Sequence, residues 1–160
     1  MGSLLGGMFM ILDDYYNYIY KMDFNELNNR FKYLGAGSSR AVYEISTDCV
    51  GKFSFNKGGD SQCSLENHIF NNCRAYFREY LCPIIWYKKG MVIMKKAEPL
   101  GNIDYNMDLN LERIGRGENV RRDMRALARK YDLLYGDLLA PSSWGFIREK
   151  LYLIDYGCKD

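Results

Sequence analysis

The sequence predicts an α+β fold with an antiparallel sheet first and helices mainly later. Three observations lead to this prediction: short β-rich segments separated by turn residues come early, a segment with helical spacing interrupts them, and a strongly amphipathic segment precedes a final hairpin. The chain has 160 residues, of which 48% are hydrophobic. It can therefore bury a core as one domain or as two small lobes.

The N-terminal part is expected to contain two short helices followed by three strands. The helices fall at residues 11–20 and 24–29, and Asp23 or Asn25 caps the second. The strands are expected at residues 30–34, 41–46 and 50–55, joined by a glycine-rich turn at 35–39 and a second turn at 47–48.

One helix then separates these strands from a hairpin. Residues 57–60 predict a flexible link, and residues 61–77 carry apolar side chains at helical spacing after a cap at Ser61 or Ser64. Strands at 84–87 and 91–94 complete an antiparallel sheet of five.

The last third predicts a helix and another hairpin. Five apolar residues in the segment 119–134 recur at intervals of four, three, four and three: Val120, Met124, Leu127, Tyr131 and Leu134. Strands at 144–148 and 151–154 follow, with a turn at 149–150.

Charge and cysteine usage exclude several classes of protein. The 22 basic and 20 acidic residues give a net charge of +2, which argues against nucleic acid and against an anionic membrane as partners. The five cysteines form no CxxC pair, which argues against a disulfide framework and a zinc site. The sequence has no apolar run of about 18 residues and no secretory signal at its start, so we expect a cytoplasmic protein.

A glycine-rich turn lies between the first two predicted strands. Gly35 and Gly37 lack a Cβ, so their backbone can approach a phosphate closely. The same pair is also typical of an ordinary hairpin turn, and Arg40 stands where a GxGxxG pattern has its third glycine.

Two charged residues interrupt apolar patterns nearby. Lys52 lies inside the third predicted strand, where it needs a carboxylate or a phosphate as partner unless the strand is at an edge. Glu66 shares a helical face with apolar residues, so it can point inward and meet Lys52 or lie in solvent.

Two aspartates follow regular elements near the C-terminus. Asp137 follows the amphipathic segment, and Asp155 ends the last predicted strand before a tyrosine and a glycine. A carboxylate in the second position can hold a metal ion, and one on a nearby loop can accept a hydroxyl proton. Both are also common turn residues.

In this order, the four signals resemble the protein-kinase-like fold. The matching segments are the glycine-rich loop at 34–43, the strand with Lys52 at 50–52, the helix glutamate Glu66, the strand at 91–94 before a hinge at 95–98, a catalytic loop in its GD form at 135–138, and a DFG-like segment at 153–157. The resemblance covers about residues 30–157. The residues Ser-Ser-Arg at 38–40 and Ser-Trp-Gly at 143–145 make the sequence similar to small kinase-like proteins of phages and prophages.

The resemblance implies three regions and a set of roles. Residues 1–29 would be a helical extension, 30–98 a kinase-like N-lobe, and 99–160 a truncated C-lobe that is mostly helical. ATP and magnesium would bind between the lobes. The implied nucleotide-binding residues are Gly35, Gly37, Ser38, Lys52 and Glu98. Glu66 would orient Lys52, Asp137 would receive the acceptor's proton, and Asp155 with Ser143 would hold magnesium.

Departures from the family's pattern leave two functions open. Serines stand where a metal-binding asparagine is expected after Asp137, and the chain ends three residues after Gly157, so we expect no activation segment or platform for a peptide substrate. One function is an ATP- and magnesium-dependent phosphotransferase with an unknown acceptor. The other is a catalytically weak pseudokinase that binds a host or phage protein.

Three further features have weaker interpretations. His68 is expected at the surface or in the core rather than as a catalytic base. A basic stripe can dock an acidic partner or nucleic acid, and it is also typical of a solvated helix face. It comprises Arg121, Arg125 and Arg129, with Arg113 and Arg116 preceding it. Tyrosines 15, 16, 18 and 20 suit either a core or a protein interface.

Overall fold

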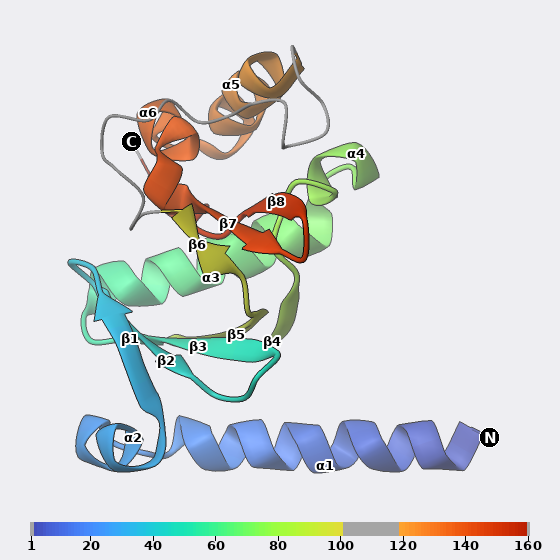
Figure 1. The fold of residues 1–160 in the computed structure, drawn as a ribbon, viewed down its shortest axis with the longest axis vertical. Helices are drawn as coiled ribbons and strands as arrows, with labels where there is room; N and C mark the ends of the chain where they lie inside the picture. Colours follow the sequence, from blue (N-terminus) through green and yellow to red (C-terminus); the bar gives the residue numbers. More distant parts are fainter. Residues whose placement is uncertain (1, 101–118, 160) are drawn as a thin grey trace.

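A five-stranded antiparallel sheet forms the centre of the computed structural model, which describes residues 2–100 and 119–159. The strand order is β1-β2-β3-β5-β4 (Figure 1). The strands are β1 (Lys32–Ala36), β2 (Arg40–Glu44), β3 (Cys49–Ser54), β4 (Ile84–Lys88) and β5 (Met91–Lys95). The α+β, protein-kinase-like fold class predicted from the sequence is thus confirmed in its sheet and in the order of its elements.

Helices cover both faces of this sheet. On one face lie α1 (Gly2–Tyr20) and α2 (Phe24–Arg30), and on the other lies α3 (Lys57–Asn72) (Figure 1). Asp23 caps α2, because its side chain accepts a hydrogen bond from the N–H of Glu26. The sheet is consequently buried on both sides, as the middle layer of three.

Strand β5 contributes to both of the resulting cores. Met91 and Ile93 pack with Tyr16 and Ile19 on the side of α1. Val92 and Met94 belong to the larger core on the side of α3. This division follows from the strand geometry, since successive side chains point to opposite faces.

A second, three-stranded sheet lies beyond α3. It consists of β6 (Glu98–Pro99), β7 (Trp144–Ile147) and β8 (Lys150–Leu153). The helical elements near it are α4 (Ala75–Arg78), α5 (Asn119–Tyr131), α6 (Tyr135–Leu139) and the 3₁₀ turn η3 (Pro141–Ser143) (Figure 1). Because β5 ends at Lys95 and β6 begins at Glu98, residues 96–97 connect the two sheets.

The predicted bounds of the central helix were wrong at both ends. The helix α3 begins at Lys57, so the link expected at residues 57–60 is helical, and the cap is Asn56, whose side chain accepts from the N–H of Gly59 at 2.9 Å. A Cβ at Gly59 would lie 2.3 Å from the carbonyl oxygen of Ser39. Glycine therefore allows the helix start to approach the glycine-rich turn, rather than making the segment flexible.

The C-terminal end of α3 lies at Asn72 instead of residue 77. The side chain of Arg78 donates hydrogen bonds to the carbonyl groups of Phe70 and Cys73, at 2.8 and 3.0 Å. These carbonyls belong to the last turn and the cap of the helix, so Arg78 satisfies acceptors that the helix itself leaves open. The short α4 then replaces the continuation that the apolar spacing predicted.

In the part of the chain that the structure describes, no helix combines the length and the apolar character needed to cross a bilayer. The C-terminal region predicted at 99–160 includes residues 101–118, so Arg113 and Arg116, which precede the basic stripe, lie outside the described residues.

Candidate functional site

A buried ion pair joins the sheet to α3. The Nζ atom of Lys52 lies 3.1 Å from Oε2 and 3.4 Å from Oε1 of Glu66. Lys52 faces α3 because it pairs with Val42 and Val92 in the middle of the sheet, between two neighbouring strands. The structure therefore brings together the two residues that the sequence placed as possible partners, and neither is at an edge or in solvent.

Arg40 is a second cation in this cluster, and the sequence analysis gave it no role at the site. Its Nη1 atom lies 2.5 Å from Oε1 of Glu66, and its Nη2 atom lies 3.3 Å from Oδ1 of Asp155. The signal that could have found it is strand alternation. Arg40 and Val42 share a face of β2, and Val42 pairs with Lys52, so Arg40 must lie on the same face as Lys52.

Glu66 is the centre of the cluster and is fully buried. Burial by itself raises the pKa of a carboxyl group, but the positive charges of Arg40 and Lys52, with hydrogen bonds from Arg40 and from the N–H of Tyr156, outweigh it. The pKa of Glu66 is consequently lowered to about 2. Glu66 is therefore ionised at neutral pH and accepts hydrogen bonds on both oxygens.

The segment after β8 is attached to the same cluster. Nζ of Lys52 donates to the carbonyl oxygen of Ile154 at 2.5 Å, and the N–H of Tyr156 donates to Oε2 of Glu66 at 3.0 Å. At Gly157 a Cβ would lie 2.6 Å from the carbonyl oxygen of Gln62 on α3, so only glycine fits without a shift. These contacts hold Asp155 beside the ion pair while 45% of its side chain stays exposed.

The second predicted aspartate, Asp137, lies in the first turn of α6 and is exposed. The main chain brings it toward Asp155, because the N–H of Leu134 donates to the carbonyl oxygen of Cys158 at 3.1 Å. Burial, followed by the charges of Asp155 and Asp137, raises the pKa of the Cys158 thiol to about 11. Both carboxylates therefore lie within electrostatic range of the same thiol.

The glycine-rich turn directly precedes Arg40 of this cluster and is held by two hydrogen bonds. The N–H of Gly37 donates to the carbonyl oxygen of Arg40 at 3.0 Å, and Nδ2 of Asn56 donates to the carbonyl oxygen of Ser38 at 3.2 Å. Gly35 has a φ of 153°, which side chains rarely allow, at an irregularity of the β1–β2 register. A Cβ at Gly35 or Gly37 would meet no atom within 4 Å, so the turn has open space beside it.

The remaining two predicted residues differ in their surroundings. Glu98 is exposed on β6, where it pairs with Phe146 of β7. Ser143 is buried at the end of η3, and its carbonyl oxygen accepts a hydrogen bond of 2.7 Å from the N–H of Ile154. Ser143 is thus one backbone hydrogen bond from the segment that carries Asp155.

The donor set fits a magnesium ion that is held mainly by phosphates. Among residues 11–100 and 119–159, no three His, Cys, Asp or Glu side chains form a group that could hold a metal. Asp155 offers a partly exposed carboxylate, the hard oxygen ligand that magnesium prefers, and magnesium in nucleotide sites commonly has one or two carboxylates plus phosphate oxygens. Asp155 would therefore be its protein ligand here.

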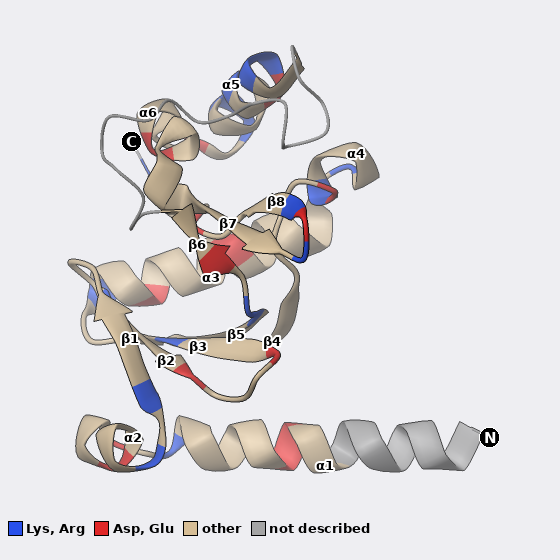
Figure 2. Ribbon diagram, in the orientation of Figure 1, with Lys and Arg blue, Asp and Glu red and all other residues tan. Residues whose placement is uncertain are grey.

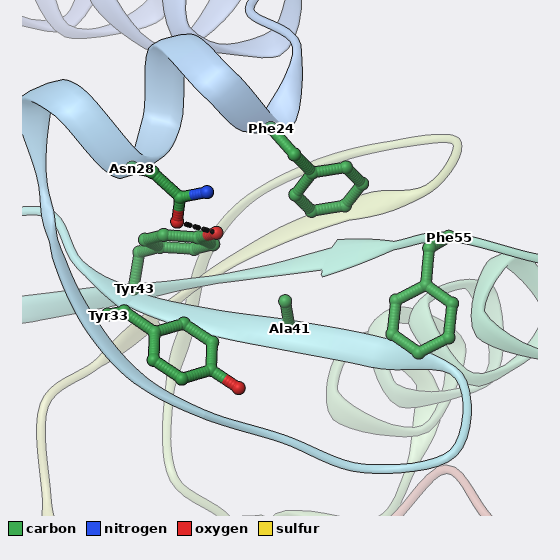
Figure 3. A pocket seen from close by; sticks show the side chains of 6 residues that line it. All are labelled: Phe24, Asn28, Tyr33, Ala41, Tyr43 and Phe55. Carbon is green, nitrogen blue, oxygen red and sulfur yellow. Dashed lines mark hydrogen bonds between the residues drawn. The ribbon is translucent and has the colours of Figure 1, made fainter.

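A cavity of about 480 Å³ lies between α2 and the first two strands of the sheet (Figure 3). Its lining is largely aromatic: Phe24, Asn28, Tyr33, Ala41, Tyr43 and Phe55. Figure 3 shows Asn28 accepting a hydrogen bond from the hydroxyl of Tyr43, at 2.6 Å. Because Ala41 and Tyr43 alternate with Arg40 and Val42 along β2, the cavity and the ion-pair cluster cannot share a face.

Two of the features with weaker interpretations from the sequence, His68 and the basic stripe, lie at the surface. His68 is exposed, and its Nδ1 lies 3.3 Å from Nδ2 of Asn72. The basic residues of α5 stand out in Figure 2, and Arg121, Arg125 and Arg129 are exposed there.

The tyrosines of α1 divide between core and surface. Tyr16 is buried in the core on that side of the sheet, and Tyr20 donates a hydrogen bond to the carbonyl oxygen of Lys89. Tyr15 and Tyr18 are exposed.

The described elements thus define an α+β protein whose antiparallel sheet carries a buried lysine–glutamate pair. Comparisons with protein-family models and with curated proteins give no match. Among solved structures 57 chains match. One is the streptomycin–ATP–APH(2")-IIa ternary complex, with 10% identity over 91% of this chain and 72% of that chain, and a TM-score of 0.41. At this identity the two chains need share no functional residue, so the chemistry must come from this protein's own side chains.

Proposed function

We propose that this protein is a kinase-like phosphotransferase that uses ATP and magnesium, with an acceptor still to be identified. The observation that carries the proposal is the buried pair of Lys52 and Glu66 next to the partly exposed Asp155. Burying charges is costly and rarely improves stability over apolar packing. A lysine fixed in this way, with an open glycine-rich turn nearby, instead suits the binding of phosphates.

Each residue would have a distinct task in this reaction. The turn at Gly35 and Gly37, with Ser38, would cover the phosphates, and Lys52, oriented by Glu66, would bind two of them. Asp155, with Ser143 nearby, would hold magnesium, which when bound neutralises phosphate charge. Asp137 would accept the proton of the attacking hydroxyl group.

Glu98 would have a different task from the residues that bind phosphate and magnesium. Glu98 follows the connection between the two sheets and would bind the base or ribose of the nucleotide. Catalysis of this kind depends on positioning and on electrostatic stabilisation, so loss of an exposed group such as Asp137 should reduce the rate more than the stability of the fold.

A pseudokinase that binds a host or phage protein is the second candidate, favoured by one specific observation. Nη2 of Arg40 lies 3.3 Å from Asp155, so the carboxylate that would hold magnesium already has a cationic partner. For either function we propose the cytoplasm as the location.

Calorimetry with ATP, with and without magnesium, distinguishes the two candidates. We expect magnesium-dependent binding that weakens roughly tenfold or more in Lys52→Met, because a charge-assisted hydrogen bond to phosphate is lost. Lys57→Met is the matched control, since Lys57 is exposed in the first turn of α3. Equal ATP binding by both variants, or no ATP binding by the wild type, would contradict the phosphotransferase function and favour the pseudokinase.

A further inference from the structure

We propose that Arg40 is a further phosphate-binding residue of the site, neutralising Asp155 while no nucleotide is bound. When a divalent cation replaces the guanidinium group of Arg40 beside Asp155, Arg40 would instead bind a phosphate group of the nucleotide. The inference rests on the proposed function, since it requires a nucleotide between the glycine-rich turn and Asp155.

The two ion pairs of Arg40 differ in length and in exposure to solvent, and the exchange of partners requires such a difference. The pair with Glu66 is short, at 2.5 Å, and both side chains are almost fully buried, with 7% and 0% exposed. The pair with Asp155 is longer, at 3.3 Å, and 45% of the Asp155 side chain is exposed. Solvent screens the second pair much more than the first. Arg40 can therefore release Asp155 while it stays anchored to Glu66.

The position of Arg40 brings it to the phosphates. It is the first residue of β2, directly after the glycine-rich turn, and its carbonyl oxygen accepts from the N–H of Gly37. A guanidinium group has five N–H donors, and a planar fork of this kind matches phosphate oxygens. The N–H groups of Arg40 that do not bind Glu66 can thus donate to a phosphate at the glycine-rich turn.

The charges of the cluster give the exchange its direction. Two carboxylates, Glu66 and Asp155, face two cations, Arg40 and Lys52, so the cluster is neutral. A divalent cation at Asp155 repels the nearby guanidinium and takes its partner. An anionic phosphate then restores the partner that Arg40 has lost. Metal and nucleotide should therefore favour each other's binding through Arg40.

The first arm of the test uses Mn²⁺ alone, observed by electron paramagnetic resonance. Arg40→Gln should bind Mn²⁺ about fivefold more tightly than the wild type, the size expected for removing one competing exposed ion pair. Asp155→Asn should abolish this binding in both backgrounds. Equal or weaker Mn²⁺ binding by a folded Arg40→Gln protein, judged by circular dichroism, would overturn the proposal.

The second arm measures binding of ATP without metal, by calorimetry in EDTA. Asp155→Asn frees Arg40 and should tighten metal-free ATP binding by about fivefold. The gain should vanish in the double variant with Arg40→Gln, whereas a purely electrostatic effect of removing the Asp155 charge would persist. Because Asp155 is partly exposed, Asp155→Asn should fold even if Arg40→Gln does not. In that case Arg40→Lys replaces Arg40→Gln in the double-mutant cycle with Asp155→Asn, and the expected change in binding is smaller.

Two outcomes separate this inference from the proposed function. If the wild type binds ATP with magnesium and Lys52→Met weakens that binding, but the cycle between Arg40 and Asp155 shows no coupling, only the role of Arg40 is wrong. If the wild type binds no ATP under either condition, the proposed function fails and the role of Arg40 fails with it.

Discussion

The main-chain N–H of Tyr156 donates a hydrogen bond of 3.0 Å to Oε2 of Glu66, across 90 residues of sequence. The carboxylate on α3 thereby fixes the segment that carries Asp155, in addition to holding Lys52 and Arg40. Glu66 is thus a structural centre of the site whatever the reaction. Its loss should disturb the sheet, the helix and the C-terminal segment together.

Glu66→Gln should destabilise the protein by about 3–5 kcal/mol, the range for breaking a buried ion pair by removing one partner. The variant leaves two buried cations, Arg40 and Lys52, facing a neutral amide. Chemical denaturation with urea would measure the change. Glu149→Gln, at an exposed turn residue, is the control and should change stability by less than about 0.5 kcal/mol. Similar stability of the two variants would contradict the central role of Glu66.

Acid stability should depend on the same carboxylate. The pKa of Glu66 is lowered from 4.5 to about 2 in the folded protein, so its contribution is fully present above pH 4.5 and is lost as the pH falls toward 2. We expect the wild type to lose stability in this window more steeply than Glu66→Gln does. Urea titrations at several pH values measure this difference, and parallel pH profiles for the two proteins would rule it out.

Two glycines near the site provide a matched pair of substitutions. Gly157→Ala places a Cβ 2.6 Å from the carbonyl oxygen of Gln62 and 2.9 Å from Cγ of Glu66, whereas a Cβ at Gly136 meets nothing within 4 Å. We expect Gly157→Ala to cost about 1–3 kcal/mol through overpacking and Gly136→Ala to be neutral or slightly stabilising. Thermal unfolding of both variants tests this, and equal melting temperatures would refute the close packing of Gly157 on α3.

Asp137→Asn should separate chemistry from binding. Asp137 is exposed on α6, so its removal should leave stability and ATP affinity within about a factor of two, while ATP turnover falls roughly 10²–10⁴-fold if it accepts the proton. Release of ADP by the wild type and by Asp137→Asn gives the comparison, with Asp14→Asn, exposed on α1, as control. Unchanged turnover in Asp137→Asn would remove this aspartate from the reaction.

Local pattern was sufficient to predict most elements of the fold. Short β-rich segments bounded by turn residues predicted the strand that carries Lys52 and the hairpin of β4 and β5, and the intervals of four and three predicted α5. It was misleading at Gly58 and Gly59, because glycines that permit a close approach resemble glycines that permit flexibility. Only the packed neighbour, Ser39, distinguishes the two.

The candidate site was predictable where a family pattern supplied it and not where partners are distant. Lys52 and Glu66 were expected as partners from their order and their faces. The contact between Arg40 and Asp155 joins residues 115 positions apart and has no periodic signature. The same holds for Tyr76 and Tyr80, whose hydroxyl groups both donate to the buried Asp123 of α5. Such pairs depend on tertiary packing, which no local window contains.

The burial of β5 on both faces has a consequence for the way the molecule opens. Met91 and Ile93 belong to one core and Val92 and Met94 to the other, so neither core can lose its packing without exposing part of this strand. The two layers of helices should therefore unfold as one cooperative unit. In native-state hydrogen exchange, the backbone amides that form hydrogen bonds between β3 and β5 should exchange most slowly, at rates that report global unfolding.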